Sequence, residues 1–175
     1  MGFFDFIANI FNKDPEKMGE KLIIEATIAQ SSGNYTKALK CLDKIIERKN
    51  LTAFSYLTAL LGKGEIFKKI GQHKEAIKCF DKALEIDFKF NPARISKGII
   101  FKEVGNMEEA LECYNKAIEI DPKFGDAYLH KGLCLKNSGH IEEAKICFKK
   151  AIQFSPHLEK IIKMNSDISS LLENS

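Results

Sequence analysis

A repeat of 34 residues constrains the fold of this chain more than any other feature of its sequence. The segments 57–90, 91–124 and 125–158 align without a gap, and ten positions are identical in all three copies. Internal repetition at this period is typical of stacked helical arrays, in which each unit contacts mainly its neighbours. The sequence therefore predicts an all-α solenoid of antiparallel helix pairs.

Two kinds of glycine divide each copy, and the copy at 91–124 shows both. Gly105 precedes Asn106 between two helical segments, and glycine readily adopts the left-handed conformation at a helix C-terminus. We expect Asn106 to cap the second helix, with Glu109 as the partner in a capping box. Gly98 lies mid-helix, where glycine costs about 1 kcal/mol relative to alanine. It therefore predicts a close approach of the second helix, with Ala110 and Ala117 as the surface it meets.

The rest of the chain divides around these copies. Gly33-Asn34 and the pattern that follows them indicate a degenerate first unit, and the next helix is expected to begin near Thr52. Phe88 replaces the proline that ends the second helix of later copies, so that helix could extend further. The predicted divisions are an amphipathic segment at 1–13, a degenerate unit at 14–51, repeat units at 52–90, 91–124 and 125–156, and one C-terminal capping helix at 157–173. In the capping helix, Ile161 is expected on the buried face.

Composition excludes several classes of protein. A net charge of +3 is too small to indicate nucleic-acid binding by itself, and no apolar run reaches the ~18 residues of a membrane-spanning helix. No secretory signal peptide is recognisable. Cys41, Cys79, Cys113 and Cys147 share one column on neighbouring hairpins about 8–10 Å apart, which is too far for disulfides. We expect free thiols and a cytoplasmic protein.

The columns resemble the tetratricopeptide repeat. The match in the third full copy comprises Tyr128, Gly132, Leu135, Gly139, Ala144, Phe148, Ala151 and Pro156. Leu60 and Arg94 depart from the usual aromatic residue of the motif. The recurring Lys-Gly dipeptide, with the run EEALECYNKAIEIDP, resembles repeats that are abundant in methanogenic archaea.

This resemblance implies a right-handed superhelix whose first helices line a concave groove for a peptide or partner helix. The function it implies is that of a non-enzymatic protein–protein interaction scaffold. The groove residues it implies are Leu61, Glu65, Lys68, Ile95, Ser96, Ile99, Lys102, Leu129, His130, Leu133 and Lys136.

The distribution of charge between the two helices of each copy indicates the class of partner. The three first-helix segments (57–70, 91–104, 125–138) contain eight Lys or Arg against three Asp or Glu, a net +5. The second-helix segments (72–90, 106–124, 140–158) contain nine Lys against eleven Asp or Glu, a net −2. The complementary partner is an acidic, partly apolar peptide or helix. Lys63, Lys97 and Lys131 could instead only cover apolar neighbours with their stems.

One known role of the family is not expected here. Some members bind the C-terminal carboxylate of heat-shock chaperones through a clamp of Lys, Asn and Arg side chains. The corresponding positions in this chain are Ile23, Thr27, Leu61, Glu65, Pro92, Ile95 and Ser96. The amide and basic side chains that hold a carboxylate are therefore missing.

The N-terminal segment is the most distinctive feature outside the repeats. Phe3, Phe4, Ile7 and Phe11 fall on one face at helical spacing, and we expect them to contact a partner or a membrane. The alternative function is a membrane-peripheral assembly scaffold anchored by this segment. Because no Lys or Arg precedes Lys13, packing against the chain's own repeats or against a second copy is favoured over membrane binding.

Enzymatic and nucleic-acid functions lack support in the sequence. The four histidines, His73, His130, His140 and His157, are scattered, and no spacing assembles a nucleophile, base and orienting group. No phosphate loop or metal motif is present, so we expect no cofactor. The first-helix faces lack the base-stacking aromatic residues of RNA-binding repeats.

Overall fold

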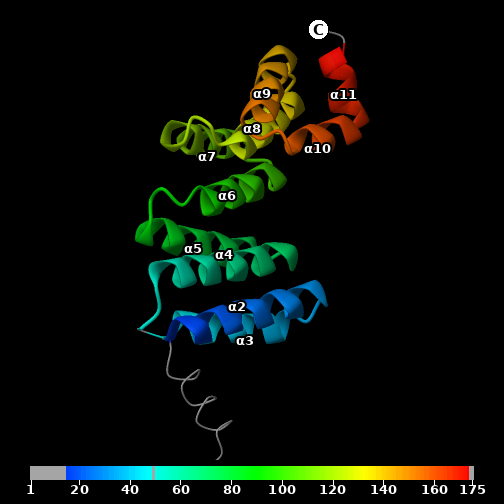
Figure 1. Ribbon diagram of the computed structural model, residues 1–175. Coiled ribbons are helices and arrows are strands. Elements are labelled where there is room, and N and C mark those ends of the chain that lie inside the picture. The colour runs from blue at the N-terminus through cyan, green and yellow to red at the C-terminus, as the bar shows by residue number, and fades with distance from the viewer. Residues whose placement is uncertain (1–14, 49, 174–175) are drawn as a thin grey trace, which may run out of the picture. The chain divides into compact units, whose positions relative to one another are not determined.

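A computed structural model describes residues 15–48 and 50–173, and every regular element in these ranges is an α-helix (Figure 1). The all-α fold class, built from antiparallel helix pairs, is thereby confirmed. The helices group into two compact units that divide between Phe90 and Asn91. The residues Phe3, Phe4, Ile7 and Phe11 of the predicted N-terminal contact lie outside the described residues.

The first unit contains two helix pairs, α2–α3 and α4–α5, and α3 packs against α4. Its helices are α2 (Pro15–Ser31), α3 (Tyr35–Ile46), α4 (Ala53–Lys69) and α5 (His73–Ile86). Thr52 caps α4, so the expected start of this helix is confirmed. A core formed by α2, α3 and α4 contains Leu22, Ala26, Ala29, Ala38, Cys41, Leu42, Ile45, Ala59 and Ile66.

The second unit contains the pairs α6–α7 and α8–α9, followed by two short helices. Its helices are α6 (Asn91–Glu103), α7 (Met107–Ile120), α8 (Gly125–Asn137), α9 (Ile141–Phe154), α10 (Leu158–Met164) and α11 (Ser166–Glu173). Tyr114 of α7 and Phe148 of α9 are fully buried. Each therefore fills the interior between the two helices of its own pair.

The turn glycines adopt the predicted left-handed conformation. Their φ angles are 75° at Gly33, 77° at Gly71, 87° at Gly105 and 81° at Gly139. In the repeat copy at 91–124, the Asn106 N–H donates a hydrogen bond to the Phe101 carbonyl at 2.8 Å, which satisfies one of the last helical carbonyls. These bonds let the chain reverse between paired helices within a few residues.

The mid-helix glycines confirm the predicted close approach, but the surface they meet is different. A Cβ added at Gly98 would lie 2.6 Å from Cε1 of Tyr114, and one at Gly132 would lie 2.7 Å from Cε1 of Phe148. Gly64 meets the Phe80 ring in the same way. The glycine thus makes room for an aromatic ring, which lies nearer to it than the predicted alanines Ala110 and Ala117 do. The ring projects further from its helix than an alanine side chain does and reaches the glycine first.

Two local predictions at helix ends also need correction. The Asn106 side chain makes no capping hydrogen bond, whereas Asn34 Oδ1 accepts one from the Lys37 N–H at 3.1 Å. Helix α5 ends at Ile86 even though Phe88 replaces proline. The reason is Asp87, whose Oδ1 accepts a hydrogen bond from the Lys89 N–H at 2.9 Å. An aspartate turn of this kind competes with helical bonding and ends the helix without proline.

The C-terminal region forms two helices where one was predicted. Asn165 has extended backbone angles (φ −88°, ψ 102°), and its Oδ1 accepts a hydrogen bond from the Ile168 N–H at 3.2 Å. Asn165 thereby caps a new helix, α11, and interrupts the predicted one. Leu158, Ile162 and Ile168 are buried, but Ile161 is 57% exposed and does not belong to the buried face.

Candidate functional site

The predicted site residues of the second unit lie on two helices that contact each other, α6 and α8. In both helices two aliphatic residues four positions apart are followed by a lysine, in the same register. The equivalent pairs are Ile95 with Leu129, Ile99 with Leu133, and Lys102 with Lys136. We call these six residues the α6–α8 row.

The two ends of the row differ in exposure. Ile95 is 6% exposed and packs in a core cluster with Tyr114, whereas Leu129 is 9% exposed and packs in another cluster with Phe148. Ser96, at 8% exposure, is also buried. Ile99, Leu133, Lys102 and Lys136 are half-buried and so retain surface that solvent reaches. The two buried members of the row, Ile95 and Leu129, pack in the core. Its four half-buried members are available for contact with a partner.

The lysines of the row lie in different surroundings. Lys136 Nζ is 3.4 Å from Oδ2 of Asp167, a largely exposed residue on α11. Lys102 lies near the Cys134 thiol, whose pKa is raised by burial and only partly lowered again by this positive charge. A carboxylate from another helix can therefore reach the Lys136 end of the row.

His130 takes a packing role. Its ring stacks on Tyr114 of α7, with centroids 5.8 Å apart and an angle of 24° between the ring planes. Burial strongly raises the pKa of the Tyr114 hydroxyl, the nearby Cys134 and Cys113 acting in the same direction. The stacked pair therefore joins α8 to the preceding helix in an apolar setting.

In the first unit, α4 presents Leu61, Glu65 and Lys68. Leu61 is half-buried, and Lys68 Nζ forms an ion pair with Glu65 Oε2 at 2.7 Å. The other carboxylate oxygen of Glu65 is buried without a hydrogen-bond partner among the described residues. Because Glu65 neutralises Lys68 within the same helix, α4 offers less positive charge than its lysine content indicates.

The lysines next to the mid-helix glycines serve packing. Lys63 Nζ lies 5.7 Å from the ring centre of Phe67, and Lys97 Nζ lies 5.7 Å from that of Phe101. Lys63 also pairs with Asp43 of α3 at 2.5 Å. Both lysines thus place their charged ends over aromatic rings, but Lys63 also forms an ion pair, so the interpretation that it only covers apolar neighbours was wrong.

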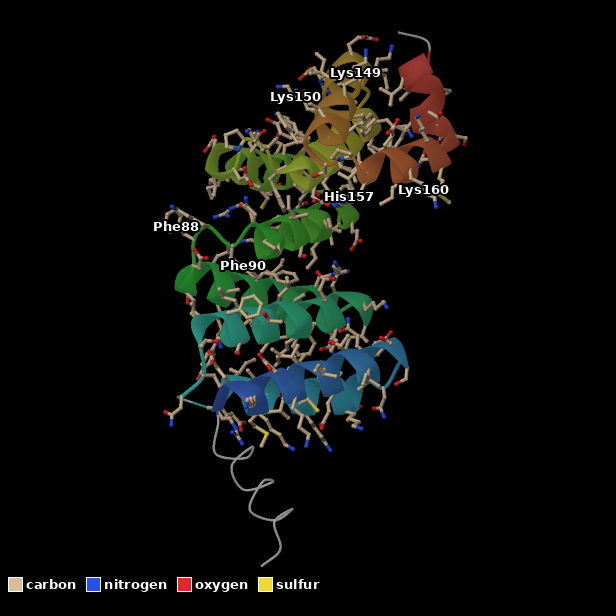
Figure 2. The ribbon with its side chains drawn as sticks, in the orientation of Figure 1. Phe88, Phe90, Lys149, Lys150, His157 and Lys160 are labelled. Carbon is tan, nitrogen blue, oxygen red and sulfur yellow. The ribbon has the colours of Figure 1, made fainter. Side chains whose placement is uncertain are left out.

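A basic, partly apolar surface at α10 was not predicted from the sequence. An open depression of about 690 Å³ is lined there by Pro156, His157, Glu159, Lys160, Lys163 and Met164. Figure 2 shows His157 and Lys160 at this end of the unit, with Lys149 and Lys150 on α9. Met164 is 78% exposed. The sequence signal for this surface is two lysines three residues apart, Lys160 and Lys163, beside Met164.

Metal-binding clusters and membrane-spanning helices are absent from the described ranges. No group of three or more His, Cys, Asp or Glu there could hold a metal ion. No described helix is both long enough and apolar enough to cross a membrane. The five cysteines are free thiols, four of them buried.

Comparison with protein families finds the tetratricopeptide repeat over most of the paired helices. Three family models with this description match residues 23–87, 92–124 and 113–146. Together these ranges cover well over half of the chain. No curated protein sequence matches the chain.

Solved structures with similar folds include three of different kinds. A crystal structure of MamA is 25% identical with a TM-score of 0.64, and the match covers 87% of this chain and 86% of that one. BtubC (BKLC) from P. vanneervenii is 17% identical with a TM-score of 0.69, covering 88% and 70%. The first TPR of Spaghetti (RPAP3), bound to the HSP90 peptide SRMEEVD, is 21% identical with a TM-score of 0.57, covering 67% and 93%.

Proposed function

The chain belongs to the tetratricopeptide repeat family, and from this premise we propose that it is a non-enzymatic protein–protein interaction scaffold. Its partner is a peptide or helix bound along the first-helix faces. The observation that carries this proposal is the α6–α8 row. Two contacting helices present half-buried apolar residues, Ile99 and Leu133, each followed one turn later by a lysine.

We propose that the partner is acidic and partly apolar. Its apolar side chains contact Ile99 and Leu133, and its carboxylates pair with Lys102 and Lys136. Lys136 already pairs with Asp167 at 3.4 Å, and because Asp167 is largely exposed, the partner's carboxylate takes its place; the pair is thus an internal example of a carboxylate reaching the row. On α4 of the first unit, taken by itself, Leu61 is half-buried and Glu65 pairs with Lys68 at 2.7 Å, so the proposal rests on the second unit.

The RPAP3 structure supports a protein partner by analogy, since its bound peptide contains three acidic residues. This chain has Glu65 and Ile95 among the positions that correspond to the chaperone clamp. We therefore propose a partner that is bound through its apolar residues and internal carboxylates, in place of a terminal carboxylate. Free thiols fit a reducing compartment, so we place this binding in the cytoplasm.

Fluorescence polarisation with two designed peptide panels tests the proposal. One panel alternates Leu with Glu, and the matched panel alternates Leu with Lys. We expect only the acidic panel to bind, and we expect Lys102→Glu with Lys136→Glu to weaken that binding at least about tenfold. Ile99→Glu with Leu133→Glu should have a similar effect while the circular dichroism spectrum stays unchanged.

The matched control is Lys123→Glu with Lys149→Glu, which reverses two exposed lysines that do not belong to the row. We expect the control to retain binding. Equal losses in the control and in the row variant would indicate a general charge effect and refute the assigned site. Binding of neither panel would refute an acidic, apolar partner.

A further inference from the structure

The outer face of α2 carries two exposed isoleucines, Ile24 and Ile28, and the residues equivalent to Ile28 in the later first helices are buried. Ile24 is 59% exposed and Ile28 is 64% exposed. Ile28 lies five residues before the turn glycine Gly33. The residues at the same distance before the later turn glycines, all 0% exposed, are Ile66, Ile100 and Cys134.

Contacts within each unit show what covers this position elsewhere. Ile66 of α4 packs in one core cluster with Leu42 and other residues of α3. Cys134 Sγ of α8 is 3.5 Å from Sδ of Met107, which belongs to α7. In both cases the position faces the second helix of the preceding pair.

The position of Ile24 also faces the side on which the second helix of a preceding pair would lie. Its equivalent in α4 is Gly62, where an added Cβ would lie 3.4 Å from the Leu42 side chain of α3. Ile24 and Ile28 therefore lie where a preceding helix would pack, and no helix of the described ranges covers them. Two adjacent exposed isoleucines on one helix face indicate a docking surface.

We propose that residues 3–11 of the same chain dock on this face of α2 as an additional helix. These residues immediately precede α2, and their apolar side chains recur at helical spacing. Segment 2–12 contains no Lys or Arg, the cations that amphipathic helices use at a membrane surface. A protein surface is therefore a better match for it than a lipid surface.

The lengths are compatible with docking within one chain. A helix over residues 3–11 would be about 13 Å long, at 1.5 Å per residue. Ile24 follows Pro15 by nine residues, which is about 14 Å along α2. A reversal at residues 12–14 would thus bring Phe3 and Phe4 alongside Ile24 and towards Ile28. The connection from α7 to α8 reverses the chain over a similarly short span, residues 121–124.

Tryptophan fluorescence tests this docking, because the chain contains no Trp and a single one reports unambiguously. In the Phe4→Trp protein we expect blue-shifted emission and weak quenching by iodide. Adding Ile24→Glu and Ile28→Glu should return both to the values of an exposed tryptophan. Adding Ile161→Glu, the same change at a similarly exposed isoleucine of α10, should leave both unchanged.

Thermal unfolding provides a second readout that does not depend on the reporter. We expect Ile24→Glu with Ile28→Glu to lower the thermal midpoint by about 5–10 °C, and deletion of residues 1–12 to do the same. In the deleted protein the two glutamate substitutions should have no further effect. Full additivity of the deletion and the substitutions would overturn the proposal.

Three further outcomes would overturn it. The first is emission typical of an exposed tryptophan in the Phe4→Trp protein. The second is a blue shift that disappears on dilution together with a doubled mass in solution, since the occupant would then be a second copy. The third is a blue shift that requires vesicles of anionic lipid, since the segment would then bind a membrane. A blue shift that is independent of concentration in a monomer supports docking within one chain.

Discussion

Replacing Gly98 with alanine should destabilise the protein, although the same change in most helices is stabilising. Glycine in a helix interior costs about 0.5–1 kcal/mol relative to alanine because of its backbone freedom. At Gly98, however, the new Cβ would lie 2.6 Å from Cε1 and 3.0 Å from Cζ of Tyr114. These separations are shorter than van der Waals contact, so one of the two groups must move.

The magnitude depends on how far the Tyr114 ring can move. The ring is 0% exposed and stacks on His130, so its displacement disturbs the packing of α7 and α8. Overpacking in an enclosed core costs about 1–3 kcal/mol, which exceeds the backbone gain. We expect Gly98→Ala to lower the free energy of unfolding by about 1–2 kcal/mol, or the midpoint temperature by about 2–8 °C.

Gly62 provides a matched control in the interior of α4. A Cβ there would lie 3.4 Å and 3.5 Å from the two methyl groups of Leu42, which is ordinary contact. We therefore expect Gly62→Ala to raise the free energy of unfolding by about 0.5–1 kcal/mol. Urea denaturation followed by circular dichroism measures both values in the same chain.

A second substitution identifies the group that causes the cost. Shortening the ring with Tyr114→Leu should reduce the additional cost of Gly98→Ala, and a double-mutant cycle gives the coupling directly. Stabilisation by Gly98→Ala equal to that by Gly62→Ala would refute the proposed contact between glycine and ring. A cost that persists unchanged in the Tyr114→Leu background would assign it to a different neighbour.

Three other changes have expected outcomes in the same unfolding assay. Tyr114→Phe removes a buried hydroxyl that has no hydrogen-bond partner among the described residues, so we expect a gain of about 1 kcal/mol; a loss would indicate a partner for this hydroxyl. Asn34→Ala removes the capping bond of α3 and should cost about 1 kcal/mol, whereas Asn106→Ala removes no such bond and should cost clearly less. Burial raises the pKa of Cys79, Cys113 and Cys147, so the folded chain retains these protons above the ordinary thiol value of 9.0. The resulting stability is fully present below pH 9 and should fall as the pH rises through the raised values; Cys→Ala at all three positions should flatten this decline.

Much of the fold could be predicted because the repeat imposes local constraints. The turn glycines, such as Gly105, were recognised from their spacing, since few other residues adopt a positive φ there. Gly98 indicated a close approach because a helix-breaking residue retained mid-helix in every copy needs a packing reason. These predictions depend on the backbone preferences of single residues, which the sequence contains directly.

The helix ends were predicted less well, even though they are also local. Asn34 and Asn106 occupy the same position before a second helix, yet only Asn34 forms the capping bond. Asp87 ends its helix without proline, and Asn165 divides the C-terminal region into two helices. Several side chains compete for the same backbone groups at a helix end, and differences below about 1 kcal/mol decide which bond forms.

The sequence by itself determined the repeat, the antiparallel pairing of its helices and the side chains that occupy each register position. Only the tertiary structure decided which of these side chains stay accessible. Ile95 and Leu129 share one register with Leu61, but they are buried and Leu61 is not. Lys68 and Lys136 share another register, but one pairs within its own helix and the other with α11. Exposure, and the pairing of Lys136 with Asp167, depend on neighbours that are distant along the chain, so a repeat pattern, which is the same in every copy, does not specify them.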